Sequence, residues 1–259
     1  MASVPRRLID WAAAFEDGAI IRAAFFGLLT ATAVILYLDY TELMGRDAAA
    51  APPEMTPVLP AFDPNSPNGK PGPAVTTPEE TLRQPLAVSL VGGGVLELTG
   101  TIDAGAAQRV AAEVAAHGEY IRTVALDSPG GSVADALAIG KLIRDKGFST
   151  SVAAGALCAS SCPLVFAGGK ERLATAQSAV GVHQIYAEIP VGSGSDRIEA
   201  AGAAMEQAQS MTAQISRYLS GMGIADEVWL KALETPPDRL TYFSASELTG
   251  LKLVTKLTN

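Results

Sequence analysis

An uncharged run of sixteen residues near the N-terminus restricts the folding of this chain more than any other feature. It extends from Ala23 to Leu38 and is flanked by Arg22 and Asp39. With the three apolar residues before the arginine, whose long side chain can reach the membrane surface, the run approaches the roughly 20 residues that cross a bilayer core. Residues 1–47 are therefore predicted to form one membrane-spanning anchor. A cleaved signal peptide and a buried helix of a soluble protein are the alternatives.

The arginines around this run predict its orientation. Arg6, Arg7 and Arg22 precede the apolar run, whereas Arg46 is the only nearby basic residue after it. Because basic residues are retained on the cytoplasmic side, we expect the N-terminus in the cytoplasm. The rest of the chain would then lie in the periplasm, attached to a bacterial inner membrane by a single-pass helix.

A proline-rich segment follows the anchor. Residues 48–85 hold ten of the sixteen prolines, mixed with alanine, threonine, asparagine and glycine. Such a segment buries little apolar surface and cannot offset the entropy lost on ordering. It is predicted to be a flexible linker between the membrane and the domain.

The remaining residues, 86–259, alternate between strand-like and helix-like segments. Apolar strands are expected near 95–98, 123–126, 151–154 and 180–182, and helices near 106–116, 133–146 and 161–167. This alternation predicts one α/β domain of stacked βαβ units with a mostly parallel sheet.

A long helix is expected over residues 196–222. Its apolar residues recur at alternating spacings of three and four, which places them on one face. They are Ile198, Ala201, Met205, Ala208, Thr212, Ile215, Leu219 and Met222. The face either packs on its own domain or forms a subunit interface in a homo-oligomer.

Charge and composition exclude several classes of function. The chain has 19 Lys+Arg against 27 Asp+Glu, a net charge of -8, and no basic block. A nucleic-acid partner is therefore not expected, because phosphate binding needs a basic patch. Two cysteines and two histidines cannot build a disulfide scaffold or a His-rich metal site, and no metal or cofactor is expected.

Three short motifs carry possible chemistry. Asp127-Ser-Pro-Gly-Gly-Ser-Val133 follows a strand and opens a helix, so its glycines either make an ordinary turn or present N–H groups to an anion. Ser160 and Ser161 begin the next helix, either as caps or as a nucleophile near the positive helix end. His183 ends a later strand and taken alone would be read as structural.

The order of these motifs resembles the Clp protease proteolytic subunit and its relatives in the ClpP/crotonase superfamily. Ser128-Pro-Gly-Gly-Ser132 is similar to the glycine loop of that family, and Cys158-Ala-Ser-Ser-Cys-Pro163 is similar to its nucleophile turn. Val182-His-Gln184 is similar to the segment of its catalytic histidine, and residues 242–254 are similar to its closing motif. The resemblance covers about residues 90–257. The anchor and linker look more like membrane-bound relatives such as signal peptide peptidases.

The resemblance implies roles for these residues. Ser160 would be the nucleophile and His183 the general base, while the N–H groups of Gly130 or Gly131 and of Ser161 would form the oxyanion hole. Small residues precede Ser160 as they precede the nucleophile in the family, which favours it over Ser161. A lysine base, as in signal peptide peptidases, is not expected, because no lysine lies between Lys170 and Lys231.

The third catalytic residue is less clearly marked. Counting back from the closing motif at Tyr242 leads to Pro236, which cannot act as an acid. Glu234 and Asp238 flank it. Glu234 matches the acidic stretch of the family, whereas Asp238 lies beyond the prolines and has the shorter side chain. Asp238 is the predicted acid and Glu234 the alternative.

Cys158 and Cys162 bracket the candidate nucleophile. In an oxidising periplasm they would form a disulfide, but a spacing of four residues demands an irregular backbone between them. Two buried free thiols are the alternative.

The expected function is a membrane-tethered serine peptidase that acts on a peptide or protein substrate outside the cytoplasm. A catalytically inactive interaction module of the same fold is the main alternative, because the acid is uncertain. A crotonase-type acyl-CoA enzyme would share the fold without needing a serine–histidine pair, and a plain scaffold would need neither.

Overall fold

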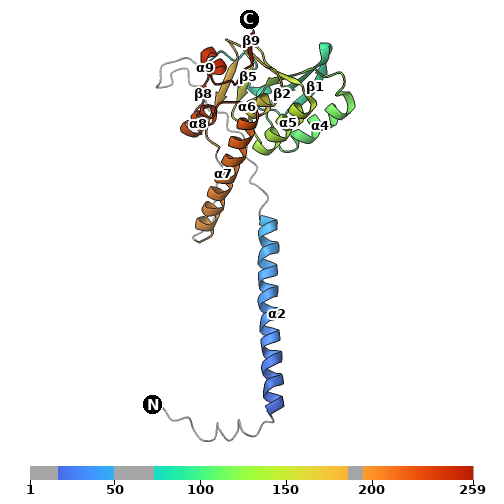
Figure 1. The fold of residues 1–259 in the computed structure, drawn as a ribbon, viewed down its shortest axis with the longest axis vertical. Coiled ribbons are helices and arrows are strands. Elements are labelled where there is room, and N and C mark those ends of the chain that lie inside the picture. Colours follow the sequence, from blue (N-terminus) through green and yellow to red (C-terminus); the bar gives the residue numbers. More distant parts are fainter. Residues whose placement is uncertain (1–16, 50–72, 186–194, 259) are drawn as a thin grey trace. The chain divides into compact units, whose positions relative to one another are not determined.

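The computed structural model describes residues 17–49, 73–185 and 195–258, which fall into two units that we describe separately (Figure 1). The first unit contains a single described helix, α2 (Asp17–Ala49). Its segment Ile21–Thr41 is 21 residues long, has a mean hydropathy of 1.9 and is 0% buried. By length and composition α2 can cross a membrane, although a signal sequence would satisfy the same criteria. Arg6, Arg7 and most of the expected linker lie outside the described residues.

The second unit is an α/β domain built on two sheets. The larger sheet has the strand order β1-β2-β3-β4-β6-β9, and the smaller one the order β5-β7-β8. Pairing is parallel except at β1–β2 and β7–β8. The strands are β1 (Ala87–Val91), β2 (Val95–Thr99), β3 (Thr123–Asp127), β4 (Ser149–Val152), β5 (Leu157–Ala159), β6 (Arg172–Thr175), β7 (Ala179–Val182), β8 (Thr241–Tyr242) and β9 (Lys256–Thr258).

Helices connect and cover these strands (Figure 1). They are α3 (Glu79–Leu82), the short 3-10 turn η1 (Gly92–Gly94), α4 (Ala106–His117), α5 (Val133–Lys146), α6 (Cys162–Ala167), α7 (Ser195–Gly221), α8 (Glu227–Glu234) and α9 (Ala245–Gly250). Helix α5 packs against both α4 and α6. The predicted α/β class with a mostly parallel sheet is confirmed. The strand expected at 151–154 begins earlier, because Gly147 ends α5 in the left-handed conformation and lets the chain enter β4 at Ser149.

Close packing at glycines brings α5, α6 and α7 together. A Cβ atom on Gly140 would come within 2.7 Å of the Leu164 carbonyl oxygen, and one on Gly168 would overlap the Gly140 carbonyl group. The same space admits the Tyr218 hydroxyl, which donates to the Leu164 carbonyl at 2.9 Å. Larger residues at these glycines would force the α6 backbone, which follows the candidate nucleophile, to move.

The long helix α7 packs on the domain through only part of its apolar stripe. Ile215 and Leu219 are buried, whereas Met205 is 66% exposed. The side chains of residues 195–200, including Ile198, lie outside the described set. Among the stripe residues whose side chains are described, packing on the domain therefore accounts for Ile215 and Leu219 and not for Met205.

The folded domain begins before the expected boundary at residue 86. The N–H of Thr76 donates to the Gly155 carbonyl at 2.9 Å, and Leu82 is buried beside Leu157 and Ala159. Residues 73–85 therefore belong to the domain rather than to a flexible linker. Prolines are frequent here, but the burial of Leu82 and the hydrogen bonds that the Thr76 N–H and hydroxyl donate to the Gly155 carbonyl offset the entropy lost on ordering.

Candidate active site

Three strands end side by side and bring the three motifs together. The parallel pairing of β5 with β7 places Ala159 opposite Gly181, and an isolated parallel bridge places Ser128 beside Cys158. Parallel strands have their carboxyl ends at the same edge of a sheet. The glycine loop after β3, the serine turn after β5 and the histidine after β7 therefore meet at one edge.

Ser160 and His183 are in hydrogen-bonding contact. The Oγ atom of Ser160 lies 2.8 Å from Nε2 of His183. Ser160 is half-buried, and His183 is buried. This is the separation that a serine nucleophile and a general base require. Burial lowers the pKa of His183 below its ordinary 6.5, because the charged imidazolium loses hydration. The ring is thereby kept neutral, which is the form that accepts a proton.

Ser160 adopts a backbone conformation that is uncommon for a residue with a side chain. Its φ angle is +60°, in the left-handed region. Its N–H donates to the Gly181 carbonyl at 3.1 Å, which ties the turn to β7. Ser161 has an ordinary φ of -82° and makes no side-chain cap of α6. Ser160 rather than Ser161 contacts the histidine.

The glycine loop packs directly against the serine turn. Gly130 has a φ of +94°, and a Cβ atom on it would come within 2.7 Å of the Ser160 Cβ and 2.8 Å of the Ser161 nitrogen. Only glycine fits this position, because both the conformation and the space exclude a side chain. The Ser161 hydroxyl donates to the Gly131 carbonyl at 3.1 Å, so a further contact holds the two loops together.

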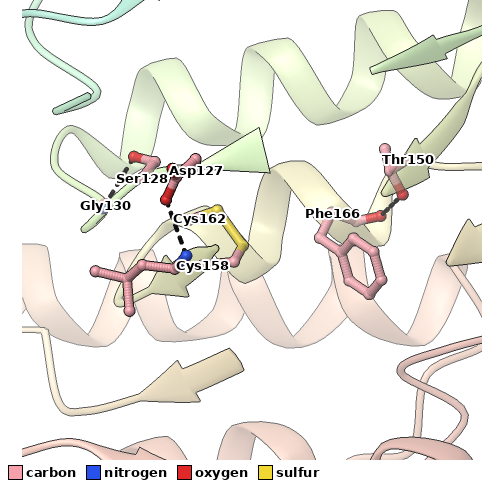
Figure 2. Close-up of a disulfide and its surroundings, with 8 residues drawn as sticks. Asp127, Ser128, Gly130, Thr150, Cys158, Cys162 and Phe166 are labelled. Atoms are coloured by element: carbon pink, nitrogen blue, oxygen red, sulfur yellow. Dashed lines mark hydrogen bonds between the residues drawn. A yellow bond between two sulfur atoms is a disulfide. The ribbon is translucent and has the colours of Figure 1, made fainter. Parts of the chain in front are cut away.

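Hydrogen bonding within the loop distinguishes the two candidate oxyanion glycines. The N–H of Gly130 donates to the Ser128 hydroxyl at 3.1 Å (Figure 2). Within the described residues, the N–H groups of Gly131 and Ser161 have no acceptor in the protein. The Gly130 N–H is therefore already engaged within the loop, whereas hydrogen bonds within the described residues leave the N–H groups of Gly131 and Ser161 available to a ligand. The sequence left this choice open.

The two carboxylates considered as the third catalytic residue are both exposed. The side chain of Asp238 is 72% exposed and pairs with Arg239 at 3.4 Å, and Glu234 is the last residue of α8 and also exposed. Within the described residues, no hydrogen bond joins either carboxylate to His183. The expected contact between Asp238 and His183 is therefore not present in this structure.

Thr235 occupies the inward position between these two acids. It is buried, and its carbonyl accepts the N–H of Gln184, the residue after His183, at 2.8 Å. Gln184 also donates its side-chain amide to the Leu233 carbonyl at 2.6 Å. The end of α8 thus contacts the histidine strand through carbonyl groups, a contact that no pattern in the sequence predicted.

Cys158 and Cys162 form a disulfide across the serine turn (Figure 2). Both residues are fully buried. Of the two alternatives that the sequence left open, the structure has the disulfide. The irregular backbone that the short spacing demands is the left-handed Ser160 between them.

Comparisons with known proteins identify the family. No curated protein matches the sequence. Among solved structures, the chain is similar to a point mutant of ClpP1 from Listeria monocytogenes, with a TM-score of 0.48 and 18% identity over 64% of this chain and 91% of that chain. The profile of the Clp protease family matches residues 88–254. With the glycine loop, Ser160 and His183 all inside the matched region, the chain belongs to the Clp protease family.

Proposed function

We propose that this protein is a serine peptidase that cleaves peptide bonds with Ser160 and His183. The observation that carries the proposal is the 2.8 Å separation between Ser160 Oγ and His183 Nε2. The family supports hydrolysis of peptides, and the neutral imidazole supports the role of a general base.

The geometry supports acyl transfer through a covalent intermediate. His183 accepts the Ser160 proton as Oγ attacks the substrate carbonyl carbon, and the carbonyl oxygen becomes an oxyanion. The N–H groups of Gly131 and Ser161 donate to that oxyanion. Protonated His183 then gives the proton to the leaving amine, and water releases the acyl group by the reverse sequence. Each oxyanion donor is worth about 10²–10³ in turnover.

Labelling by a fluorophosphonate tests the proposal, because the reagent bonds covalently to an activated serine. We expect the unmodified protein to label and Ser160→Ala not to label. Ser161→Ala is the matched variant, since it lies next in the chain and keeps its backbone N–H. It should retain labelling at a reduced rate through loss of the hydroxyl bond to Gly131. Labelling of Ser160→Ala alongside none of Ser161→Ala would reverse the assignment.

A catalytically inactive interaction module is the second candidate. The exposed positions of Asp238 and Glu234 favour it, because neither supports the imidazole. A folded protein that does not label, at any pH between 6 and 9, would establish this candidate. The matched family is a protease family, so the match does not support the crotonase-type alternative.

The proposed location is the periplasmic face of a bacterial inner membrane, with α2 as the anchor. Support comes from the apolar helix, the arginines before it and the disulfide, since disulfides persist in oxidising compartments. A reporter that is active only in the periplasm, fused after Asn259, should be active. Activity of a cytoplasm-only reporter at the same point would refute this location.

We further propose that α7 mediates a homo-oligomer. Met205 and Leu230 are among the residues that line a groove between α7 and α8, and these two residues are 66% and 53% exposed. Large exposed apolar residues in a group indicate an interaction surface. Light scattering should show an assembly for the unmodified domain and a smaller species for Met205→Glu. An unchanged mass would argue against this surface.

A further inference from the structure

The disulfide joins two elements that are each held firmly by the domain. Cys158 is the middle residue of β5, where it pairs with Val180 and lies beside Ser128. Cys162 is the first residue of α6, whose six residues are all buried. The two Cα atoms lie 5.1 Å apart. Only three residues lie between the bonded cysteines, so the bond restricts the path that the backbone can take from strand to helix (Figure 2).

Ser160, the middle residue of that path, has a left-handed backbone conformation. Ser160 at a φ of +60° is disfavoured relative to the ordinary right-handed region, as it is for any residue with a Cβ atom. Such a conformation persists only where the surroundings impose it. A relaxation of φ to negative values would rotate the Cα–Cβ bond and carry Oγ away from Nε2 of His183.

The other contacts of the turn are packing against Gly130 and hydrogen bonds that each act at one point, of which two involve the serines themselves. The Ser160 N–H donates to Gly181, and the Ser161 hydroxyl donates to Gly131. The first holds one end of the Ser160 residue, and the second depends on a side-chain rotamer. Neither sets the distance between the end of β5 and the beginning of α6, which the disulfide does.

We propose that the Cys158–Cys162 disulfide is a positioning element of the active site, and that the reduced protein folds but is a poor catalyst. The disulfide holds Ser160 in its left-handed conformation, with Oγ against His183, and directs the Ser161 N–H toward the oxyanion. The inference rests on the proposed function in so far as it concerns catalysis. It makes the activity of this site depend on an oxidising environment.

The first experiment compares the oxidised protein with protein refolded in dithiothreitol. The dithiol gives two electrons and two protons to the disulfide, forming two thiols and its own cyclic disulfide. We expect the rate constant of fluorophosphonate labelling to fall about 10²-fold, as for an ångström-scale misplacement, while the half-saturating reagent concentration changes little. Reoxidation should restore the rate. If the oxidised protein labels, an equal rate in the reduced form would overturn the proposal.

Variants separate positioning from general loss of stability. Cys158→Ala/Cys162→Ala should label as slowly as the reduced protein and be insensitive to dithiothreitol. Val165→Ala is the matched control, because it removes buried volume from the same helix without touching the turn. It should lower the melting temperature and leave the labelling rate unchanged. If Val165→Ala slows labelling as much as the double variant, the disulfide has no specific role.

Hydrogen exchange provides a readout that does not need activity. In the double variant, the Ser160 amide, which donates to Gly181, should exchange faster, while amides of β3 keep their protection. Unchanged exchange at Ser160 would overturn the proposal even if labelling fails throughout. Absence of labelling in the oxidised protein, with faster exchange in the variant, would refute the peptidase function and leave the positioning role standing.

Discussion

The two sides of the candidate site differ in how the chain holds them. On the nucleophile side, Ser160 and His183 follow neighbouring parallel strands whose register is set by backbone hydrogen bonds, and a disulfide ties β5 to the helix α6 that follows Ser160. On the other side, Glu234 ends α8, and residues 235–240 connect that helix to the two-residue strand β8 through two consecutive prolines. The first side has its side chains in contact, and the second exposes both of its acids. The order of motifs in the sequence therefore predicts the positions of side chains at strand ends more reliably than those of side chains at a helix end or in a loop.

Removing the base tests the nucleophile side most severely. His183→Ala should lower labelling and peptide turnover by about 10⁶-fold, as removal of a catalytic histidine does in other serine peptidases. The reason is that Ser160 then has no acceptor for its proton at 2.8 Å. Steady-state hydrolysis of a fluorogenic peptide measures the loss. A decrease of less than tenfold would show that another group acts as the base.

Filling the space at Gly130 tests the packing of the two loops. Gly130→Ala should reduce labelling by at least about 10²-fold, since the added Cβ would lie 2.7 Å from the Ser160 Cβ at a φ of +94°. Gly147→Ala is the matched control, because Gly147 also has a positive φ but no atom lies within 4 Å of its added Cβ. The control should lose stability and keep its labelling rate. Similar rates for the two variants would contradict the packing argument.

The pH dependence tests the environment of His183. Burial lowers its pKa, so the imidazole remains neutral to a pH below 6.5. The labelling rate should therefore be nearly constant above pH 7 and fall as the pH drops through the lowered pKa, by about tenfold per unit on the acid limb. Rates measured between pH 4.5 and 9 give the midpoint. A midpoint above 6.5 would mean that a nearby negative charge outweighs burial.

The smallest effects are expected on the acid side. Asp238→Asn and Glu234→Gln should each change the labelling rate by less than about threefold, because exposed charges in water interact weakly with a distant group. Both variants keep the size of the side chain, so folding is not at issue. A large loss in either variant would show that its carboxylate reaches His183 when substrate binds.

Much of the fold could be predicted from particular residues. The helix at residues 133–146 has Ser132 as a cap and Gly147 as its end, and the structure has α5 at those residues. The strands β1, β5, β6, β8 and β9 were not predicted: β1 and β9 lie at the edges of the larger sheet, and β5, β6 and β8 are two to four residues long and lack a marked apolar pattern. The ordered segment at residues 73–85 was missed for another reason: its proline content suggests disorder, and its burial depends on Leu157 and Ala159, far along the chain.

The sequence by itself determined the α/β class, the apolar helix near the N-terminus, and the order of glycine loop, serine and histidine, because each depends on local pattern or on neighbours in the chain. The tertiary structure decided which atoms meet. It gave the Gly130 N–H an acceptor in Ser128, and it paired the cysteines across a left-handed serine. It also turned Thr235 inward and left Asp238 in solvent. These outcomes depend on loop conformation and on contacts between distant residues, which no local pattern encodes.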